Sequence, residues 1–184
     1  MAASLRKDSL NRKLIALANA ALAGKDVTVD ACDFHQFDMP VYDGDIEATT
    51  GLPAGAKEFV QHLNDCEALI ISTPEYNGGI PGSLKNAIDW ASRSRPIPFT
   101  NKPVLLLGAS PGGFGAVRGL WHARVPFEAI GTFVYPSMFG LPHANEAFDP
   151  AGKFTDPKNN ARLEETIVGF LKFARSLQDF GTRA

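Results

Sequence analysis

Residues 73–82 read Thr-Pro-Glu-Tyr-Asn-Gly-Gly-Ile-Pro-Gly and directly follow the short apolar run 68–72. An uninterrupted apolar run of this length is typical of a parallel strand that is buried on both faces. The pair Gly78-Gly79 allows positive φ angles and lets the backbone approach a flat ligand without a Cβ atom between them. A plain surface turn is the alternative interpretation. The length and composition of the segment favour a ligand-binding loop at the carboxyl end of a strand.

Helical and strand patterns alternate on both sides of this loop. The predicted helices and strands cover, in chain order, 8–22 (helix), 27–34 (strand), 54–64 (helix), 68–73 (strand), 82–93 (helix), 104–109 (strand), 116–129 (helix), 132–135 (strand) and 157–180 (helix). Residues 35–53 are rich in Asp, Gly, Pro and Thr and are predicted to form a loop. The alternation predicts an α/β fold, a doubly wound parallel sheet with helices on both faces. No repeat or linker divides the chain, so residues 1–184 are predicted to form a single domain.

The beginning of the chain is unusual for such a sheet. A doubly wound sheet of the 2-1-3-4-5 type has five strands, and the patterns above supply four. The first strand should precede the first helix, yet only Met1, Ala2 and Ala3 stand ahead of Ser4. We therefore expect the first strand to be missing or truncated, through a start assigned too late or in a shortened protein. Losing several buried residues from a central strand could exceed a typical stability margin of about 5–15 kcal/mol.

Composition excludes several classes of function. The net charge of -2 gives no basic field that would attract nucleic acid or a membrane surface. The two cysteines form no disulfide framework, and the four histidines are too scattered to predict a metal site. No apolar run is long enough to span a bilayer, and the first residues lack the apolar core of a signal peptide. A cytoplasmic location is expected.

A second candidate binding loop lies just ahead of the first helix. Ser4, Arg6, Ser9 and Asn11 place hydroxyls, a guanidinium and an amide near a helix N-terminus. Free N–H groups and the helix dipole favour a phosphate there, and an arginine adds charge-assisted hydrogen bonds. A frayed tail that merely carries a helix cap is the alternative.

The third loop, residues 108–116, reads Gly-Ala-Ser-Pro-Gly-Gly-Phe-Gly-Ala between a strand and a helix. It lacks the last small residue of the dinucleotide fingerprint and the Gly-Lys-Ser/Thr of a Walker A loop. Its small residues suit close approach of the backbone to a ligand, although a plain strand-to-helix turn is the alternative. In the preceding helix, Trp90 is expected to pack in the core or against another subunit.

With these loops in view, the sequence resembles the NAD(P)H-dependent FMN reductases, a flavodoxin-like family that includes quinone, chromate and azo-dye reductases. The most specific elements are Pro74-Glu75-Tyr76-Asn77-Gly78 and the following 84–90, Leu-Lys-Asn-Ala-Ile-Asp-Trp. Supporting elements are the Ser4–Asn11 pattern, residues 108–112 and the turn at 148–153. Members of the family usually begin with a short apolar strand that ends in Gly-Ser, where this chain has Ala3-Ser4.

The resemblance implies a site built on bound FMN. Ser4, Arg6, Ser9 and Asn11 would hold the phosphate of the cofactor. Other residues would line the flavin ring: Pro74, Glu75, Tyr76, Asn77 and Gly78 on one side, and Ser110, Gly112 and Gly113 on the other. Tyr76 is a weak candidate for proton donation, and no other catalytic residue is predicted, because the cofactor carries the chemistry. The resemblance also implies a homodimer or homotetramer.

The predicted activity is hydride transfer from NADPH or NADH through FMN to small acceptors such as quinones, flavins, azo compounds or chromate. An electron-transfer flavodoxin is the main alternative, but such proteins are usually strongly acidic and lack an arginine in the phosphate loop. A remnant that has lost its core strand and binds no flavin is the third. The sequence decides neither between NADH and NADPH nor among the acceptors.

Overall fold

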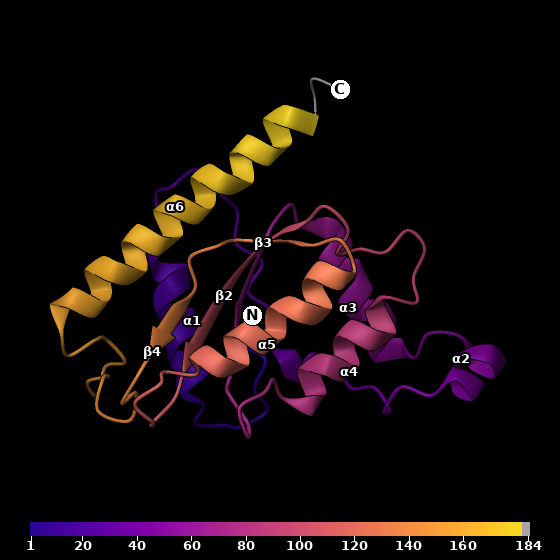
Figure 1. The fold of residues 1–184 in the computed structure, drawn as a ribbon, viewed down its shortest axis with the longest axis horizontal. Helices are drawn as coiled ribbons and strands as arrows, with labels where there is room; N and C mark the ends of the chain where they lie inside the picture. The colour runs from indigo at the N-terminus through magenta and orange to yellow at the C-terminus, as the bar shows by residue number, and fades with distance from the viewer. Residues whose placement is uncertain (182–184) are drawn as a thin grey trace.

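A parallel β-sheet between two layers of helices forms the body of the protein (Figure 1). The structure is a computed structural model in which residues 1–181 are described. Its strands are β1 (Leu69–Ser72), β2 (Pro103–Ala109), β3 (Phe133–Val134) and β4 (Phe139–Leu141). All pairings are parallel: β1 and β3 flank β2, and β4 pairs with the carboxyl half of β2. The predicted doubly wound α/β fold is confirmed.

Strand β2 lies at the centre of the sheet, where it pairs with β1, β3 and β4, and every one of its residues is buried. Its register with β1 aligns Leu69 with Val104 and Ser72 with Leu107. The continuous apolar sequence of β2 follows from this position, since both faces of the strand pack against helices.

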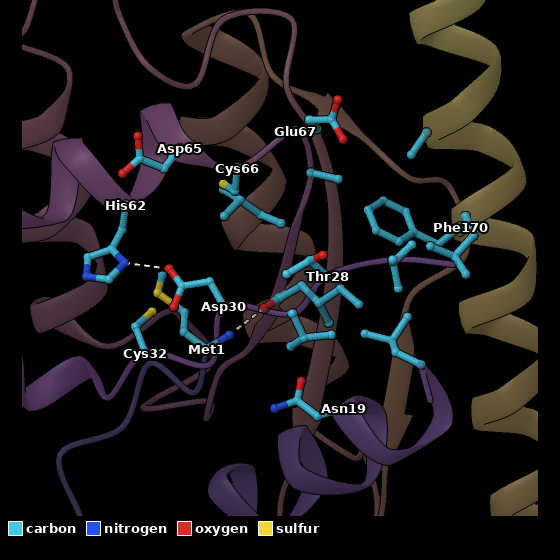
Figure 2. A pocket seen from close by; sticks show the side chains of 18 of the residues that line it. Met1, Asn19, Thr28, Asp30, Cys32, His62, Asp65, Cys66, Glu67 and Phe170 are labelled. Atoms are coloured by element: carbon cyan, nitrogen blue, oxygen red, sulfur yellow. Dashed lines mark hydrogen bonds and ion pairs between the residues drawn. The ribbon is translucent and has the colours of Figure 1, made fainter. Parts of the chain in front are cut away.

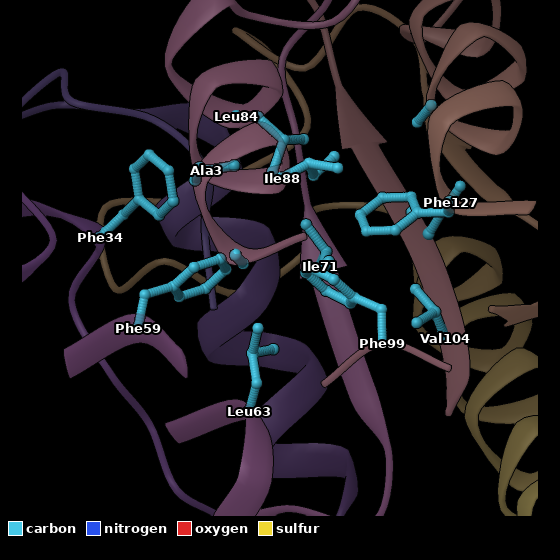
Figure 3. Close-up of a cluster of buried hydrophobic side chains, with 14 of the residues drawn as sticks. Ala3, Phe34, Phe59, Leu63, Ile71, Leu84, Ile88, Phe99, Val104 and Phe127 are labelled. Atoms are coloured by element: carbon cyan, nitrogen blue, oxygen red, sulfur yellow. The ribbon is translucent and has the colours of Figure 1, made fainter. Parts of the chain in front are cut away.

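The helices cover the two faces of the sheet separately. On one face lie α1 (Leu10–Ala21) and α6 (Pro157–Gly181), and on the other lie α3 (Ala54–Asp65), α4 (Gly82–Ala91) and α5 (Val117–Ala129). Each layer encloses its own apolar core, the first around Leu14, Leu105 and Ile167 and the second around Phe59, Leu106 and Phe127. Figure 3 shows part of the second core. Within residues 1–181, no helix is both long and apolar enough to cross a membrane.

The connection between α1 and α3 differs from the prediction. Residues 35–53 were expected to be loop throughout, but they contain the end of a short 3-10 helix, η1 (Phe34–Gln36), and a helical segment, α2 (Gly44–Thr50). Both begin at aspartates, Asp33 and Asp43, whose side chains accept hydrogen bonds from backbone N–H groups two residues ahead. Local capping of this kind stabilises short helices in a sequence that is otherwise typical of loops.

Residues 1–3 lie beside β1, where the first strand of such a sheet is expected. Met1 and Ala3 pair with β1 in parallel: the amino group of Met1 donates to Ile70 O at 2.8 Å, and Ala3 N donates to Ser72 O at 2.8 Å. Between them, Ser72 N donates to Met1 O at 3.0 Å. Ser4 therefore leaves the sheet beside the end of β1 and is not part of a free tail.

The prediction of a strand at 27–34 is wrong in this structure. Residues 27–33 are irregular, and Val27 and Val29 remain 40% and 41% exposed. Within the described residues, the backbone groups of residues 27–32 form no backbone–backbone hydrogen bond. A strand requires a hydrogen-bonded neighbour, so the alternating side-chain pattern alone does not produce one.

The last predicted strand also differs in extent. Only Phe133–Val134 of the predicted range 132–135 pair with β2, and a further short strand, β4, was not predicted. Tyr135 N still donates to Val104 O at 2.8 Å before the chain turns away. The edge of the sheet is thus shared by two short strands, each too short for a clear sequence pattern.

Candidate functional site

The three predicted binding loops meet at the carboxyl edge of the sheet, at the lower side of the view in Figure 1. They follow residues 1–3, β1 and β2, and a fourth segment follows β4. Asn11 and Ser110 join them: Asn11 contacts the ends of β1 and β2, and Ser110 exchanges hydrogen bonds with Leu141 and Ala144. This edge is where open α/β sheets bind ligands.

The loop ahead of α1 presents unpaired backbone donors. Within residues 1–181, none of the backbone N–H groups from Leu5 to Leu10 donates to another protein group. The side chain of Ser9 caps α1 by accepting from Asn11 N at 3.2 Å. Arg6 is exposed and forms no ion pair within the described chain. Free N–H groups at a helix N-terminus, with a guanidinium beside them, form a site for an anion.

Ser4, Ser9 and Asn11 differ from Arg6 because they are buried. The side chain of Asn11 is used within the protein: Nδ2 donates to Ala109 O, and Oδ1 accepts from Ala109 N and from Ser72 Oγ. These contacts position the first loop against the ends of β1 and β2. Any contribution of Asn11 to phosphate binding therefore acts through the placement of the loop.

His35, which the sequence did not indicate as a site residue, also holds the loop ahead of α1 in place. His35 Nε2 donates to Leu5 O at 2.9 Å, and His35 Nδ1 lies 3.0 Å from Asp33 Oδ1. Asp33 also pairs with Arg12 of α1. The hydrogen bonds from Arg12 and His35 hold the pKa of Asp33 well below its usual range. His35 follows the segment predicted as strand 27–34, so its place at a carboxyl end was the available sequence signal.

The loop after β1 turns sharply at Asn77-Gly78. Tyr76 N donates to Gly79 O at 2.9 Å and Gly79 N donates to Tyr76 O at 3.0 Å. Asn77 and Gly78 both have positive φ, 52° and 76°, as a type I′ turn requires. Pro74 is buried at the start of the loop, whereas Tyr76 and Asn77 are exposed at its tip. The turn displays a rigid edge of backbone and side-chain polar groups.

Glu75 ties this loop to the beginning of α5. Its Oε1 accepts from Arg118 Nε at 2.7 Å and its Oε2 accepts from Gly119 N at 3.1 Å. Burial by itself raises the pKa of the Glu75 carboxyl, but the hydrogen bonds from Gly119 and Arg118 outweigh it, and the pKa falls below its usual value. Glu75 is therefore held as a carboxylate that fixes the loop, and its oxygens are engaged inside the protein.

The loop after β2 approaches the other segments closely. Ser110 Oγ accepts from Gly112 N at 3.2 Å, and His143 N donates to Gly112 O at 3.3 Å. Gly115 has a φ of 57°, and a Cβ there would lie 2.7 Å from Pro142 N. Gly112 and Gly113 are exposed, so their backbone is open to a ligand.

Aromatic side chains border the loops. Tyr76 and Phe114 are exposed, and the guanidinium of Arg118 lies 4.8 Å from the ring centroid of Phe114. On α4, Asp89 forms an ion pair with Lys85, four positions earlier. Trp90 is buried as expected, and its indole N–H donates to Pro40 O.

No group of three or more His, Cys, Asp or Glu side chains is placed to hold a metal ion in residues 1–181.

The residues fit a flavin mononucleotide at this edge. The unpaired N–H groups and Arg6 provide donors for a phosphate, and α1 has no acidic residue in its first turn to oppose one. The Asn77-Gly78 turn and the open backbone of Gly112 and Gly113 supply hydrogen-bonding edges and Cβ-free surface for a flat ring system. Two of the predicted residues, Asn11 and Glu75, use their side chains for internal contacts.

Comparison with known proteins gives consistent matches. Residues 1–146 match the family model described as NADPH-dependent FMN reductase. An NAD(P)H-dependent FMN reductase of Pseudomonas aeruginosa is 33% identical over 177 residues, which cover 95% of this chain and 93% of that protein. A 2-hydroxy-1,4-benzoquinone reductase of a Burkholderia species is 39% identical over 94% of this chain and 92% of its own length. The structure of FerB, a flavoenzyme NAD(P)H:(acceptor) oxidoreductase of Paracoccus denitrificans, is similar at a TM-score of 0.82 and 31% identity, covering 96% of this chain and 95% of that chain.

Proposed function

The chain belongs to the NADPH-dependent FMN reductase family, and from this premise we propose which of its residues serve the activity. It is an NAD(P)H-dependent oxidoreductase that uses FMN to reduce small acceptors. The observation that carries the site proposal is the run of unpaired N–H groups from Leu5 to Leu10 beside the exposed guanidinium of Arg6.

These donors would hold the phosphate of FMN. Ser4 and Ser9 begin and end the loop, and Asn11 fixes it to the carboxyl ends of β1 and β2. Because the loop is already ordered by Asn11 and His35, little backbone entropy remains to be lost when the anion binds.

The other two loops would border the flavin ring. Asn77 and Gly78 present one hydrogen-bonding edge, and Ser110, Gly112 and Gly113 present a second. Pro74 and Glu75 support the first edge, since Pro74 is buried and Glu75 is tied to α5. The Tyr76 side chain is half exposed at the tip, where its hydroxyl could donate a proton to a reduced acceptor.

FMN, when bound, supplies the redox chemistry by accepting a hydride from NAD(P)H and passing reducing equivalents to the acceptor. The contribution of the protein is position: it would anchor the phosphate, and Tyr76 and Phe114, on the two proposed ring-binding loops, are both exposed to solvent. An open face suits donor and acceptor binding in turn, which predicts ping-pong kinetics. Quinones are the proposed acceptor class, because several similar proteins bear the name quinone reductase.

We also propose a homodimer in the cytoplasm. On α5, Trp121 and Val125 lie one turn apart and are 59% and 68% exposed, which leaves an apolar strip uncovered in one subunit. The cytoplasmic location is proposed because the electron donor is an intracellular dinucleotide and because Cys32 and Cys66 are free thiols. Replacing Trp121 by lysine is expected to shift the protein towards monomers in analytical ultracentrifugation, whereas Lys57→Ala on α3 is the control and should not.

A visible absorption titration tests the function. FMN added to the purified protein should acquire a perturbed, bound spectrum that bleaches when NADPH is added without oxygen, and the colour should return with a quinone. An electron-transfer flavodoxin would bind FMN but would need a partner reductase for this bleaching. A protein that takes up no FMN would contradict the proposed phosphate site directly.

A further inference from the structure

His35 fixes the orientation of one peptide unit in the loop ahead of α1. Its Nε2 lies 2.9 Å from Leu5 O, and a carbonyl oxygen only accepts, so this hydrogen bond needs a proton on Nε2. In a trans peptide the C=O and N–H groups point in opposite directions. The bond to Leu5 O therefore also sets the direction of Arg6 N–H, which donates to no other protein group within residues 1–181. This N–H is one of the donors proposed for the phosphate.

The other ring nitrogen of His35 lies beside two side chains of opposite charge. Nδ1 is 3.0 Å from Asp33 Oδ1 and 3.3 Å from Arg12 Nη2, and Arg12 also pairs with Asp33. Hydrogen bonds from Arg12 and His35 hold the pKa of Asp33 well below its usual range, so its side chain is a carboxylate that only accepts. The guanidinium of Arg12 only donates. Nδ1 therefore faces one acceptor and one donor.

The protonation state of His35 decides which of these contacts form. The imidazolium has hydrogens on both nitrogens and donates to Leu5 O and to Asp33 Oδ1 together. The neutral ring has one hydrogen. If Nε2 carries it, the bond to Leu5 O remains and Nδ1 accepts from Arg12. If Nδ1 carries it, the ring donates to Asp33, and the lone pair of Nε2 faces Leu5 O, which breaks the contact with the loop.

We propose that His35 is a positioning residue for the FMN phosphate, and that Arg12 holds the neutral ring of His35 in the tautomer that donates to Leu5 O. The proposal rests on the phosphate site proposed above and explains how its loop keeps its orientation when the pH changes. With Arg12 in place, the bond to Leu5 O survives the loss of a proton from His35. Without Arg12, the Asp33 carboxylate draws the remaining hydrogen to Nδ1.

Charged groups approach His35 from two elements. Asp33 begins η1 and Arg12 lies in the first turn of α1. In the part of the chain that the structure describes, no other charged side chain lies at hydrogen-bonding distance from His35. Asp33 and His35 are about half exposed, so their contacts contribute little to the free energy of folding. Substitutions in this group should therefore leave the thermal midpoint close to that of the parent protein.

The test compares the dissociation constant of FMN at about pH 6 and about pH 9, on either side of the range in which histidines lose their proton. Arg12→Met keeps the apolar stem and removes the donor. At the lower pH the imidazolium still donates to Leu5 O in this variant, but at the higher pH the neutral ring does not. The FMN affinity of Arg12→Met relative to the parent should fall by about three- to tenfold between the two. The titration of the phosphate itself cancels in this ratio.

Lys13→Met is the matched control, because it removes a neighbouring cation of α1 whose Nζ lies over the ring of Phe148 and not beside His35. Its affinity ratio should be the same at both pH values. His35→Leu should bind FMN less tightly at both, and His35→Gln, whose amide can donate to Leu5 O, should recover most of the loss. An equal loss at both pH values in Arg12→Met, or no recovery with glutamine, would overturn the proposal.

A second readout needs no FMN, because the nitrogen chemical shifts of an imidazole show which nitrogen carries the hydrogen. His62 is the internal reference: its Nδ1 lies 2.6 Å from Asp30 Oδ2, with no arginine at hydrogen-bonding distance in the described residues (Figure 2). At about pH 9, the hydrogen should be on Nε2 of His35 and on Nδ1 of His62 in the parent protein. In Arg12→Met, His35 should change to the tautomer of His62.

The two readouts separate this proposal from the proposed function. An unchanged tautomer of His35 in Arg12→Met would overturn the role of Arg12, whatever the affinity for FMN. A parent protein that binds no FMN would refute the phosphate site and the positioning role of His35 with it, while the spectra would still decide the tautomer.

Discussion

Asn11 and Ala109, which are 98 positions apart in the sequence, exchange two hydrogen bonds between the side chain of one and the backbone of the other. Asn11 Nδ2 donates to Ala109 O at 3.0 Å, and Ala109 N donates to Asn11 Oδ1 at 2.9 Å. The same Oδ1 accepts from Ser72 Oγ at 2.9 Å. One buried amide therefore joins the first turn of α1 to the ends of β1 and β2, which fixes the origin of all three loops of the proposed flavin site.

Replacing Asn11 by alanine is expected to destabilise the protein by about 2–4 kcal/mol, because the backbone groups of Ala109 and the hydroxyl of Ser72 are left buried and unpaired. Urea unfolding measures this change. Asn19→Ala is the matched control: it lies on the same helix, is partly exposed and should cost less than about 1 kcal/mol. Similar losses in the two variants would contradict the role of Asn11.

Gly115 is expected to tolerate no side chain. A Cβ there would stand 2.7 Å from Pro142 N at a φ of 57°, so Gly115→Ala should cost about 3 kcal/mol or more and displace the loop after β2. Gly24 has a similar φ of 73° with no atom within 4 Å of the added Cβ. Gly24→Ala should therefore cost only about 1 kcal/mol. Denaturant unfolding of both variants separates the steric effect from backbone strain.

Removing the guanidinium of Arg6 is expected to weaken FMN binding by about 10- to 100-fold, the effect of losing a charge-assisted contact to phosphate. Fluorescence titration with FMN measures it. Lys7→Ala removes an adjacent exposed charge and should change the dissociation constant by less than about threefold. Riboflavin, which lacks the phosphate, should bind both variants and the parent protein equally. An Arg6→Ala protein with unchanged FMN affinity would refute the placement of the phosphate.

The amino group of Met1 predicts a pH dependence of stability. Its pKa in the folded protein lies below the usual 8.0 because burial disfavours the charged form. Between the lowered pKa and 8.0 the unfolded chain binds more protons than the folded one, so stability should rise as pH rises towards 8. Acetylation of the amino group removes this titration. Thermal midpoints of the acetylated and free proteins should therefore converge as the pH approaches 8, and parallel curves would contradict the prediction.

The sequence by itself determined the layered α/β fold and the elements of the proposed site. The apolar runs at 68–72 and 104–109 predicted buried parallel strands because both faces of such strands exclude water, and β1 and β2 lie there. The local sequence also determined two features of the loops. The Asn77-Gly78 pair favours positive φ in any structural context, and Ser9 caps the helix that follows it directly in the sequence.

The tertiary structure decided what depends on partners distant in the sequence. Residues 27–34 have a strand pattern but form no strand, because a strand needs a hydrogen-bonded neighbour and the backbone of residues 27–32 has none within the described chain. The local motif predicts that Asn11 is a phosphate ligand, but its side-chain amide forms hydrogen bonds with Ala109 and Ser72. Local propensity is encoded within a few residues, whereas hydrogen-bond partners and cavities arise only when distant segments are brought together.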